Sequence, residues 1–156
     1  MTVKLQEGLQ EAINLATEAT NQQVEPEHLL LALFKQEDSI VAECFSKLNF
    51  PALKIIEEEL SKIARVSGKN LQVYFSGRFN TLMNNASKEA KAMKDEFVSG
   101  EHVLLAIFSD EDSPLAKELK RNRIDKEKVL TALASIRGTH RITDEAPEEG
   151  YPEEYP

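Results

Sequence analysis

A stretch of 19 residues is written twice in this chain, and this internal repeat constrains the fold more than any other feature of the sequence. Residues 24–42 align with residues 98–116 without a gap, at an offset of 74, and 11 of the 19 aligned positions are identical. Shared helical composition alone would not produce such agreement. Two copies of one unit in 156 residues predict a tandem of two small, similar halves that pack against each other.

The repeated stretch contains six consecutive apolar residues, 29–34 in the first copy and 103–108 in the second. Such a run is too short to cross a membrane, and periodicity alone does not distinguish a buried strand from a buried helix. The flanking residues favour a helix, because Pro26 and Gly100 occupy its first position and Ser99 is a good N-cap. We therefore expect two short helices that are buried on all sides.

Apolar residues at a spacing of three and four predict further helices on both sides of each copy. The first helix of each half follows a capping residue, Thr2 or Ser76, and similar apolar stripes recur at 40–48, 53–63, 115–119 and 129–136. The predicted fold class is all-α, with eight helices forming two four-helix repeats related by a pseudo-twofold axis.

The same patterns predict the domain boundaries. Residues 1–143 form one domain, in which repeat one covers about 2–64 and repeat two about 77–138. The connector 65–76 has no helical period. Residues 144–156 are acidic and rich in proline, so we expect a flexible tail or linker.

Charge and cysteine usage exclude several classes of protein. The net charge is −8, and residues 144–156 contribute six acidic and no basic side chains, so the rest is nearly neutral. Such a chain lacks the basic face that nucleic-acid binding requires. Cys44, the single cysteine, lies in an apolar stripe and reads as a buried structural thiol of a reducing compartment. No signal peptide or long apolar segment is visible, and we expect a cytoplasmic protein without membrane contact.

The sequence contains no convincing catalytic or cofactor motif. The pairs Glu27-His28 and Glu101-His102 differ in order and spacing from the zinc-binding H-E-x-x-H helix. Residues 67–69 resemble the end of a P-loop but lack its first glycine. We expect no metal and no cofactor. A small hydrolase using Glu and His is a remote alternative, since it would need an acid, a base and a nucleophile in one cleft.

Two interpretations of the Glu-His pairs stay open at this point. In the first, Glu27 and Glu101 are helix-start residues that interact favourably with the helix dipole, and His28 and His102 hold the adjoining loops. In the second, each helix N-terminus and its carboxylate form a site for the basic or phosphorylated arginine side chains of another protein.

The repeat resembles a known family motif. Residues 25–33 and 101–106 are similar to the Clp repeat found twice in the N-terminal domain of the Clp family of AAA+ unfoldases and disaggregases. Residues 66–76, 95–99 and 137–144 resemble the ClpB disaggregase branch in particular. The resemblance extends from about residue 5 to residue 144, and it implies the eight-helix pseudo-twofold fold that the apolar patterns predict independently.

The resemblance implies a substrate- or adaptor-binding module without catalysis of its own, tethered to ATPase rings that pull polypeptides through a pore. ClpB-type proteins act in the stress response, so unfolded or aggregated polypeptides are the expected clients, with adaptor proteins as further partners. Aligned by motif, the peptide-binding residues would be Thr2, Asp95 and Glu101 as polar members and Met83 as an apolar member.

The resemblance also leaves alternatives. In the ClpC branch, the glutamates matching Glu27 and Glu101 hold phosphorylated arginine, but the dipeptides at 25–26 and 99–100 depart here from that branch's Gly-Thr. The acidic tail ends where an ATPase module would begin. The chain is therefore expected to be either the N-terminal part of such an ATPase or a free-standing adaptor that docks on a separate Clp ATPase ring.

Overall fold

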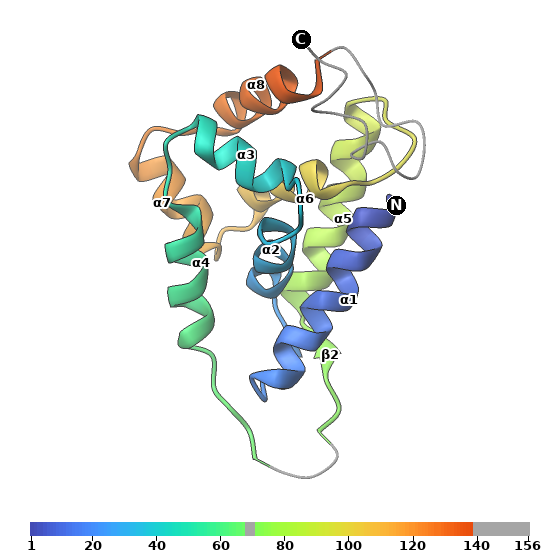
Figure 1. Ribbon diagram of the computed structural model, residues 1–156, viewed down its shortest axis with the longest axis vertical. Coiled ribbons are helices and arrows are strands. Elements are labelled where there is room, and N and C mark those ends of the chain that lie inside the picture. Colours follow the sequence, from blue (N-terminus) through green and yellow to red (C-terminus); the bar gives the residue numbers. More distant parts are fainter. Residues whose placement is uncertain (68–70, 139–156) are drawn as a thin grey trace.

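The computed structural model describes residues 1–67 and 71–138 (Figure 1). The expected tail at 144–156 lies outside the described residues. Within them, the predicted all-α fold with eight α-helices is confirmed. The helices of the first half are α1 (Val3–Glu18), α2 (Pro26–Phe34), α3 (Ile40–Lys47) and α4 (Ala52–Ser61). Those of the second half are α5 (Gly77–Ala92), α6 (Gly100–Ala106), α7 (Pro114–Arg121) and α8 (Lys126–Arg137), with a 3₁₀ turn η1 (Ile107–Ser109) after α6.

The repeat in the sequence is also a repeat in the backbone. Every helix of the second half begins 74 residues after its counterpart in the first half. The caps repeat as well, because the Thr2 and Ser76 hydroxyls each accept a hydrogen bond from the backbone N–H three residues later. Even left-handed backbone recurs at the same offset, with φ of 53° at Asn49 and 61° at Arg123. Two similar local sequences have therefore folded into two similar local structures.

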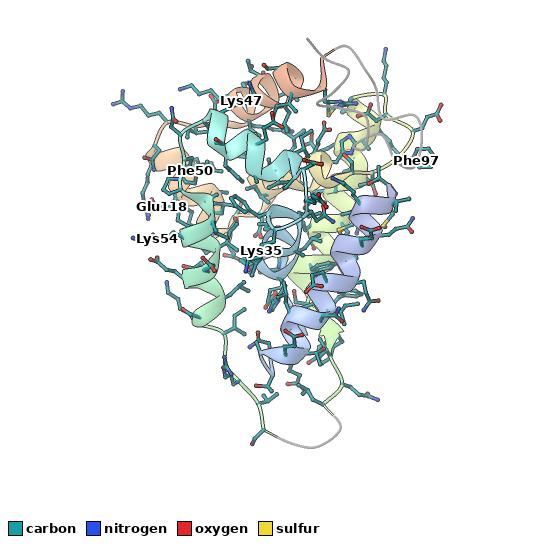
Figure 2. All side chains as sticks on the ribbon, viewed as in Figure 1. Lys35, Lys47, Phe50, Lys54, Phe97 and Glu118 are labelled. Carbon is teal, nitrogen blue, oxygen red and sulfur yellow. The ribbon has the colours of Figure 1, made fainter. Side chains whose placement is uncertain are left out.

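Helices α2 and α6 lie in the middle of the molecule, as the apolar runs 29–34 and 103–108 predict (Figure 1). Helix α1 packs on α2, and α5 packs on α6. The two halves interlock, because α3 contacts α6 and α8 while α4 contacts α7. Side chains fill the interior between the helices, whereas Lys47 and Lys54 lie on the outer surface of α3 and α4 (Figure 2).

The core contains the apolar residues that the repeated stretch predicts. Leu30, Leu104 and Leu105 are completely buried, and Leu31 is nearly so. The two phenylalanines that end the apolar runs, Phe34 and Phe108, are partly buried at the edge of the core. Among the described residues, no helix combines the length and apolar character needed to cross a membrane.

A short parallel strand pair joins the two halves and is not evident in the sequence. Strand β1 (Gln23–Val24) pairs with β2 (Tyr74–Phe75), with Gln23 opposite Tyr74 and Val24 opposite Phe75. Strands of two residues are too short to produce an alternating pattern. The pair fixes the end of the connector beside the entrance to α2, and Ser76 then caps α5 directly after β2.

Candidate functional site

Five polar residues are buried together where α6 begins, and we call them the α6 cluster: Asp95, Ser99, Glu101, His102 and Arg137. Each is at most 9% exposed. Asp95 follows the end of α5, Ser99 is the N-cap of α6, and Glu101 and His102 lie in the first turn of α6. Arg137 is the last residue of α8. Three separate segments of the second half therefore meet in this cluster.

Arg137 is the cation of the α6 cluster. Its Nη1 and Nη2 atoms donate to Oδ2 and Oδ1 of Asp95 at 3.0 and 2.8 Å, which is a bidentate pair. Its Nε atom forms an ion pair with Oε2 of Glu101 at 3.3 Å. One guanidinium thus pairs with two buried carboxylates, and buried charges require such pairing.

His102 closes the cluster as a neutral side chain. The backbone N–H of Ser99 donates to Nδ1 at 2.9 Å, so the ring proton lies on Nε2, which donates to Oδ2 of Asp95 at 2.8 Å. Burial lowers the pKa of His102, although the hydrogen bond to Asp95 acts in the opposite direction. The imidazole is therefore uncharged at neutral pH and serves as a cap on the helix start.

The first half contains a counterpart at the start of α2, with one informative difference. The Glu25 N–H donates to Nδ1 of His28 at 2.9 Å, and the Nε2 of His28 donates to Oδ1 of Asn21 at 3.0 Å. Burial likewise lowers the pKa of His28. Asn21 stands where the second half has Asp95, and its amide donates to the Ala64 carbonyl at 3.2 Å. A neutral amide suits this site because its partner is a backbone carbonyl, which needs a donor, and not a guanidinium, which needs an acceptor.

Glu27 binds an arginine from the other half of the molecule. The Nη1 and Nη2 atoms of Arg78, in the first turn of α5, donate to Oε1 and Oε2 of Glu27 at 3.3 and 3.1 Å. The same guanidinium donates to Oδ2 of Asp110 at 2.8 Å. Both repeated glutamates, Glu27 and Glu101, therefore meet a guanidinium, as the chemistry of a carboxylate at a helix start suggests. In both cases the arginine belongs to this chain.

The structure brings together three of the four residues that the family resemblance implies for peptide binding. The Thr2 N–H donates to the Val98 carbonyl at 2.9 Å, which places the start of α1 against the loop that carries Asp95 and leads to Glu101. Thr2 is fully buried and caps α1. Met83 lies in the middle of α5 and is partly buried against the core. Thr2 thus holds backbone in place, while Asp95 and Glu101 pair with the Arg137 side chain, and all three residues lie inside the molecule.

Sequence reasoning did not identify Arg137 as a member of the site. Arg137 belongs to a segment that resembles the ClpB branch, but the helix dipole readily explains a basic residue at the end of an amphipathic helix. The signal that could have indicated it is its position after Ile136 and Leu133, on a face that is otherwise buried. Its partner Asp95 is 42 residues away in the sequence.

The α6 cluster contains a Ser-His-Asp series, which bears on the hydrolase alternative. The Ser99 hydroxyl lies 3.2 Å from Nδ1 of His102, whose Nε2 reaches Asp95. Ser99 and His102 have no exposed surface, and Nδ1 already accepts the Ser99 backbone N–H. A substrate therefore has no access to the hydroxyl, and the ring nitrogen that would have to take its proton is occupied.

Other reactive groups are also poorly placed for chemistry. Burial, with help from the charges of Glu101 and Glu43, raises the pKa of the Cys44 thiol to about 12, which leaves it unreactive. Within residues 1–67 and 71–138, no three His, Cys, Asp or Glu side chains come together in a way that could hold a metal ion.

The fold and the buried clusters define a class of protein: an α-helical module of two interlocked repeats, each organised around a histidine-capped central helix. The profile described as "Clp repeat (R) N-terminal domain" matches residues 1–122. The chain belongs to this Clp N-terminal domain family.

Relatives and solved structures agree with the family. The chain is 36% identical over 154 residues to the chaperone protein ClpB of Bdellovibrio bacteriovorus and 37% identical over 157 residues to that of Bacillus cereus. Each alignment covers 97% of this chain and 18% of the relative, so the chain spans about a fifth of the length of these proteins.

Two solved structures share the fold. The N-terminal domain of Hsp104 from Candida albicans has a TM-score of 0.79 at 21% identity, with 95% of this chain and 98% of that chain covered. A ClpV N-domain in complex with a VipB peptide has a TM-score of 0.71 at 18% identity, with 94% and 90% covered.

Proposed function

We propose that this chain is the non-catalytic client- and adaptor-binding domain of a ClpB-like disaggregase or unfoldase. Its clients are unfolded or aggregated polypeptides, and the ATPase activity belongs to other modules of the machine. The observation that carries the proposal is the alignment of 97% of this chain with 18% of ClpB relatives at 36% identity. The ClpV N-domain that holds a VipB peptide supports peptide binding by a module of this fold.

The proposed binding surface lies on α5 and on the loop from α5 to α6. Met83, Phe97 and Val98 are partly exposed there, and Figure 2 shows Phe97 at the outer edge of the molecule. Methionine adapts to varied apolar partners, as a surface that accepts many unfolded chains requires. Thr2 supports this surface from inside by its hydrogen bond to the loop backbone, and the acidic residues of the α6 cluster support it by pairing with Arg137 at the end of α8.

A titration tests this proposal. Reduced, carboxymethylated lactalbumin, a permanently unfolded chain, is added to the isotope-labelled domain while backbone amide shifts are followed. The shifts should gather on the loop from α5 to α6, around Met83 and at the start of α1. Met83→Asp should weaken binding by about fivefold or more. Desolvating a charge at an apolar contact makes the free energy of binding less favourable by roughly 1 kcal/mol or more.

Leu9→Asp provides the matched control for this titration. Leu9 occupies the position equivalent to Met83 in the first half and is also partly buried against the core. We expect Leu9→Asp to bind the unfolded chain with the same affinity as the wild-type domain. Weaker binding by Leu9→Asp with unchanged binding by Met83→Asp would move the surface to the first half. A wild-type domain that binds no unfolded chain would overturn the proposed function.

A further inference from the structure

Arg137 connects two parts of the molecule that are distant in sequence: the loop from α5 to α6 and the end of α8. The bidentate pair with Asp95 and the ion pair with Glu101 are almost completely buried, with Arg137 5% exposed and Glu101 fully buried. A buried ion pair contributes little net stability compared with apolar packing, but separating its partners would leave uncompensated charge in the interior. The guanidinium therefore sets how the loop sits relative to the last turn of α8.

A continuous series of contacts leads from Arg137 to the start of α1. From the Asp95 carboxylate, the series continues to the His102 ring and then to the Ser99 N–H. The neighbouring Val98 carbonyl accepts the Thr2 N–H at 2.9 Å, and the Thr2 hydroxyl caps α1. The loop that carries Phe97 and Val98 is thus held on one side by α8 and on the other by α1.

The first half lacks this connection, although its histidine makes the same kinds of hydrogen bond at the start of α2. Helix α8 continues two residues beyond the position equivalent to the end of α4, and Arg137 is the residue that this extension adds last. In the first half, the position equivalent to Arg137 is Ile63. The Asn21 amide donates a hydrogen bond to the backbone carbonyl of the next residue, Ala64. The ionic link to the fourth helix is therefore specific to the half in which the binding surface is proposed.

From this asymmetry we infer that Arg137 is a positioning residue of the peptide-binding surface, and that client binding and docking of the last turn of α8 stabilise each other. The inference rests on the proposed function. Its physical basis is thermodynamic linkage. If the Arg137 contacts stabilise the loop conformation that binds clients, they raise client affinity. A bound client must then stabilise the Arg137 contacts by the same factor.

Hydrogen exchange and client affinity together test the inference. Saturating carboxymethylated lactalbumin should slow hydrogen exchange at the amides of Arg137 and Gly138 in the wild-type domain by a factor of about five or more. A factor of this size lies within the usual range of coupling between two sites. Arg137→Met should weaken client binding by a similar factor and abolish the protection. Arg137→Lys should lie between the two, because it keeps the charge but loses the bidentate geometry.

Arg78→Met is the matched control, since Arg78 also pairs with two carboxylates, those of Glu27 at the start of α2 and of Asp110 after η1. Both variants should be destabilised, because each removes one partner of an ion pair, so affinities are compared at a temperature where each retains the native helical spectrum. The control should keep the protection at the end of α8. If Arg137→Met does not fold, Arg137→Lys carries the test.

The outcomes separate the two proposals. Absence of client binding by the wild-type domain overturns the proposed function. Client binding without added protection at Arg137 and Gly138 overturns the inference alone. Equal loss of client affinity in Arg137→Met and Arg78→Met would show that general destabilisation causes the loss. This result would also contradict the inference.

Discussion

At the scale of single residues, the two histidines explain why a polar motif can begin a completely buried helix. His28 and His102 each accept a backbone N–H from the N-cap residue and donate to a side-chain oxygen seven residues earlier. A helix start buried without such partners would leave its N–H groups unsatisfied. The neutral imidazole provides both an acceptor and a donor, which neither lysine nor arginine can do.

This role predicts a pH dependence of stability. Burial lowers the pKa of both histidines below the ordinary value of 6.5, so the unfolded chain binds more protons than the folded protein once the pH falls below about 6.5. The free energy of unfolding should therefore decrease as the pH falls from 7.5 to 5.5, and each histidine's contribution levels off below its folded pKa. Urea unfolding measured across this range checks the prediction.

The matched variants for this experiment are His28→Gln and His102→Gln. Glutamine at the third helical position can still accept from the N-cap backbone, and it does not titrate. Each variant should lower the slope of stability against pH by up to about 1.4 kcal/mol per pH unit, the limit for one proton. A slope unchanged in both variants would assign the pH dependence to other groups.

At the scale of helices, α1 and α2 approach each other closely at Gly8. A Cβ atom built on Gly8 would lie 2.8 Å from Cδ2 of Leu33, which real structures do not tolerate without a shift. Leu33 is itself 2% exposed and has little room to move. The absence of a side chain at Gly8 is therefore what allows the two helices to pack at this distance.

Gly8→Ala should destabilise the protein by about 1–3 kcal/mol, because overpacking of a filled core outweighs the gain of roughly 0.5–1 kcal/mol in helix propensity. Gly77→Ala is the control, since Gly77 begins α5 and a Cβ there would meet nothing within 4 Å. This second variant should be neutral or slightly stabilising. Thermal melts that rank the two variants in the opposite order would contradict the close-packing argument.

At the scale of the whole molecule, the two repeats share one core and are not independent domains. Helix α3 packs on α6 and α8, α4 packs on α7, and Arg78 of the second half binds Glu27 of the first. The β1–β2 pair adds backbone hydrogen bonds between the first half and the end of the connector that leads into α5. A small half-domain removed from these contacts would expose most of its apolar surface.

We therefore expect one cooperative unfolding transition. Urea unfolding followed by far-UV circular dichroism should coincide with unfolding followed by near-UV signals from Tyr74 in the connector. Residues 1–66 expressed alone should lack a cooperative transition, because α2, α3 and α4 lose their partners in the second half. Two separate transitions, or a stably folded first half, would show that the repeats fold independently.

The sequence by itself determined the tandem, the all-α class, the position of each helix and the family. These properties are local or repeated: apolar spacing, caps such as Thr2 and Ser76, and two copies of one motif are visible in short windows of sequence. Glu27 and Glu101 were recognisable as special for the same reason, since each stands in the first turn of a repeated helix.

Only the tertiary structure decided what those special residues contact. Arg137 reaches Asp95 from 42 residues away, and Arg78 reaches Glu27 from 51 residues away, so no local pattern encodes either pair. Tertiary packing also buries Thr2, Asp95 and Glu101, the three polar residues for which the resemblance implies peptide binding. Other segments of the chain cover the helix starts at Thr2 and Glu101 and the loop at Asp95. A periodic sequence specifies which face of a helix is buried, but the partner that covers its end depends on how distant helices are brought together.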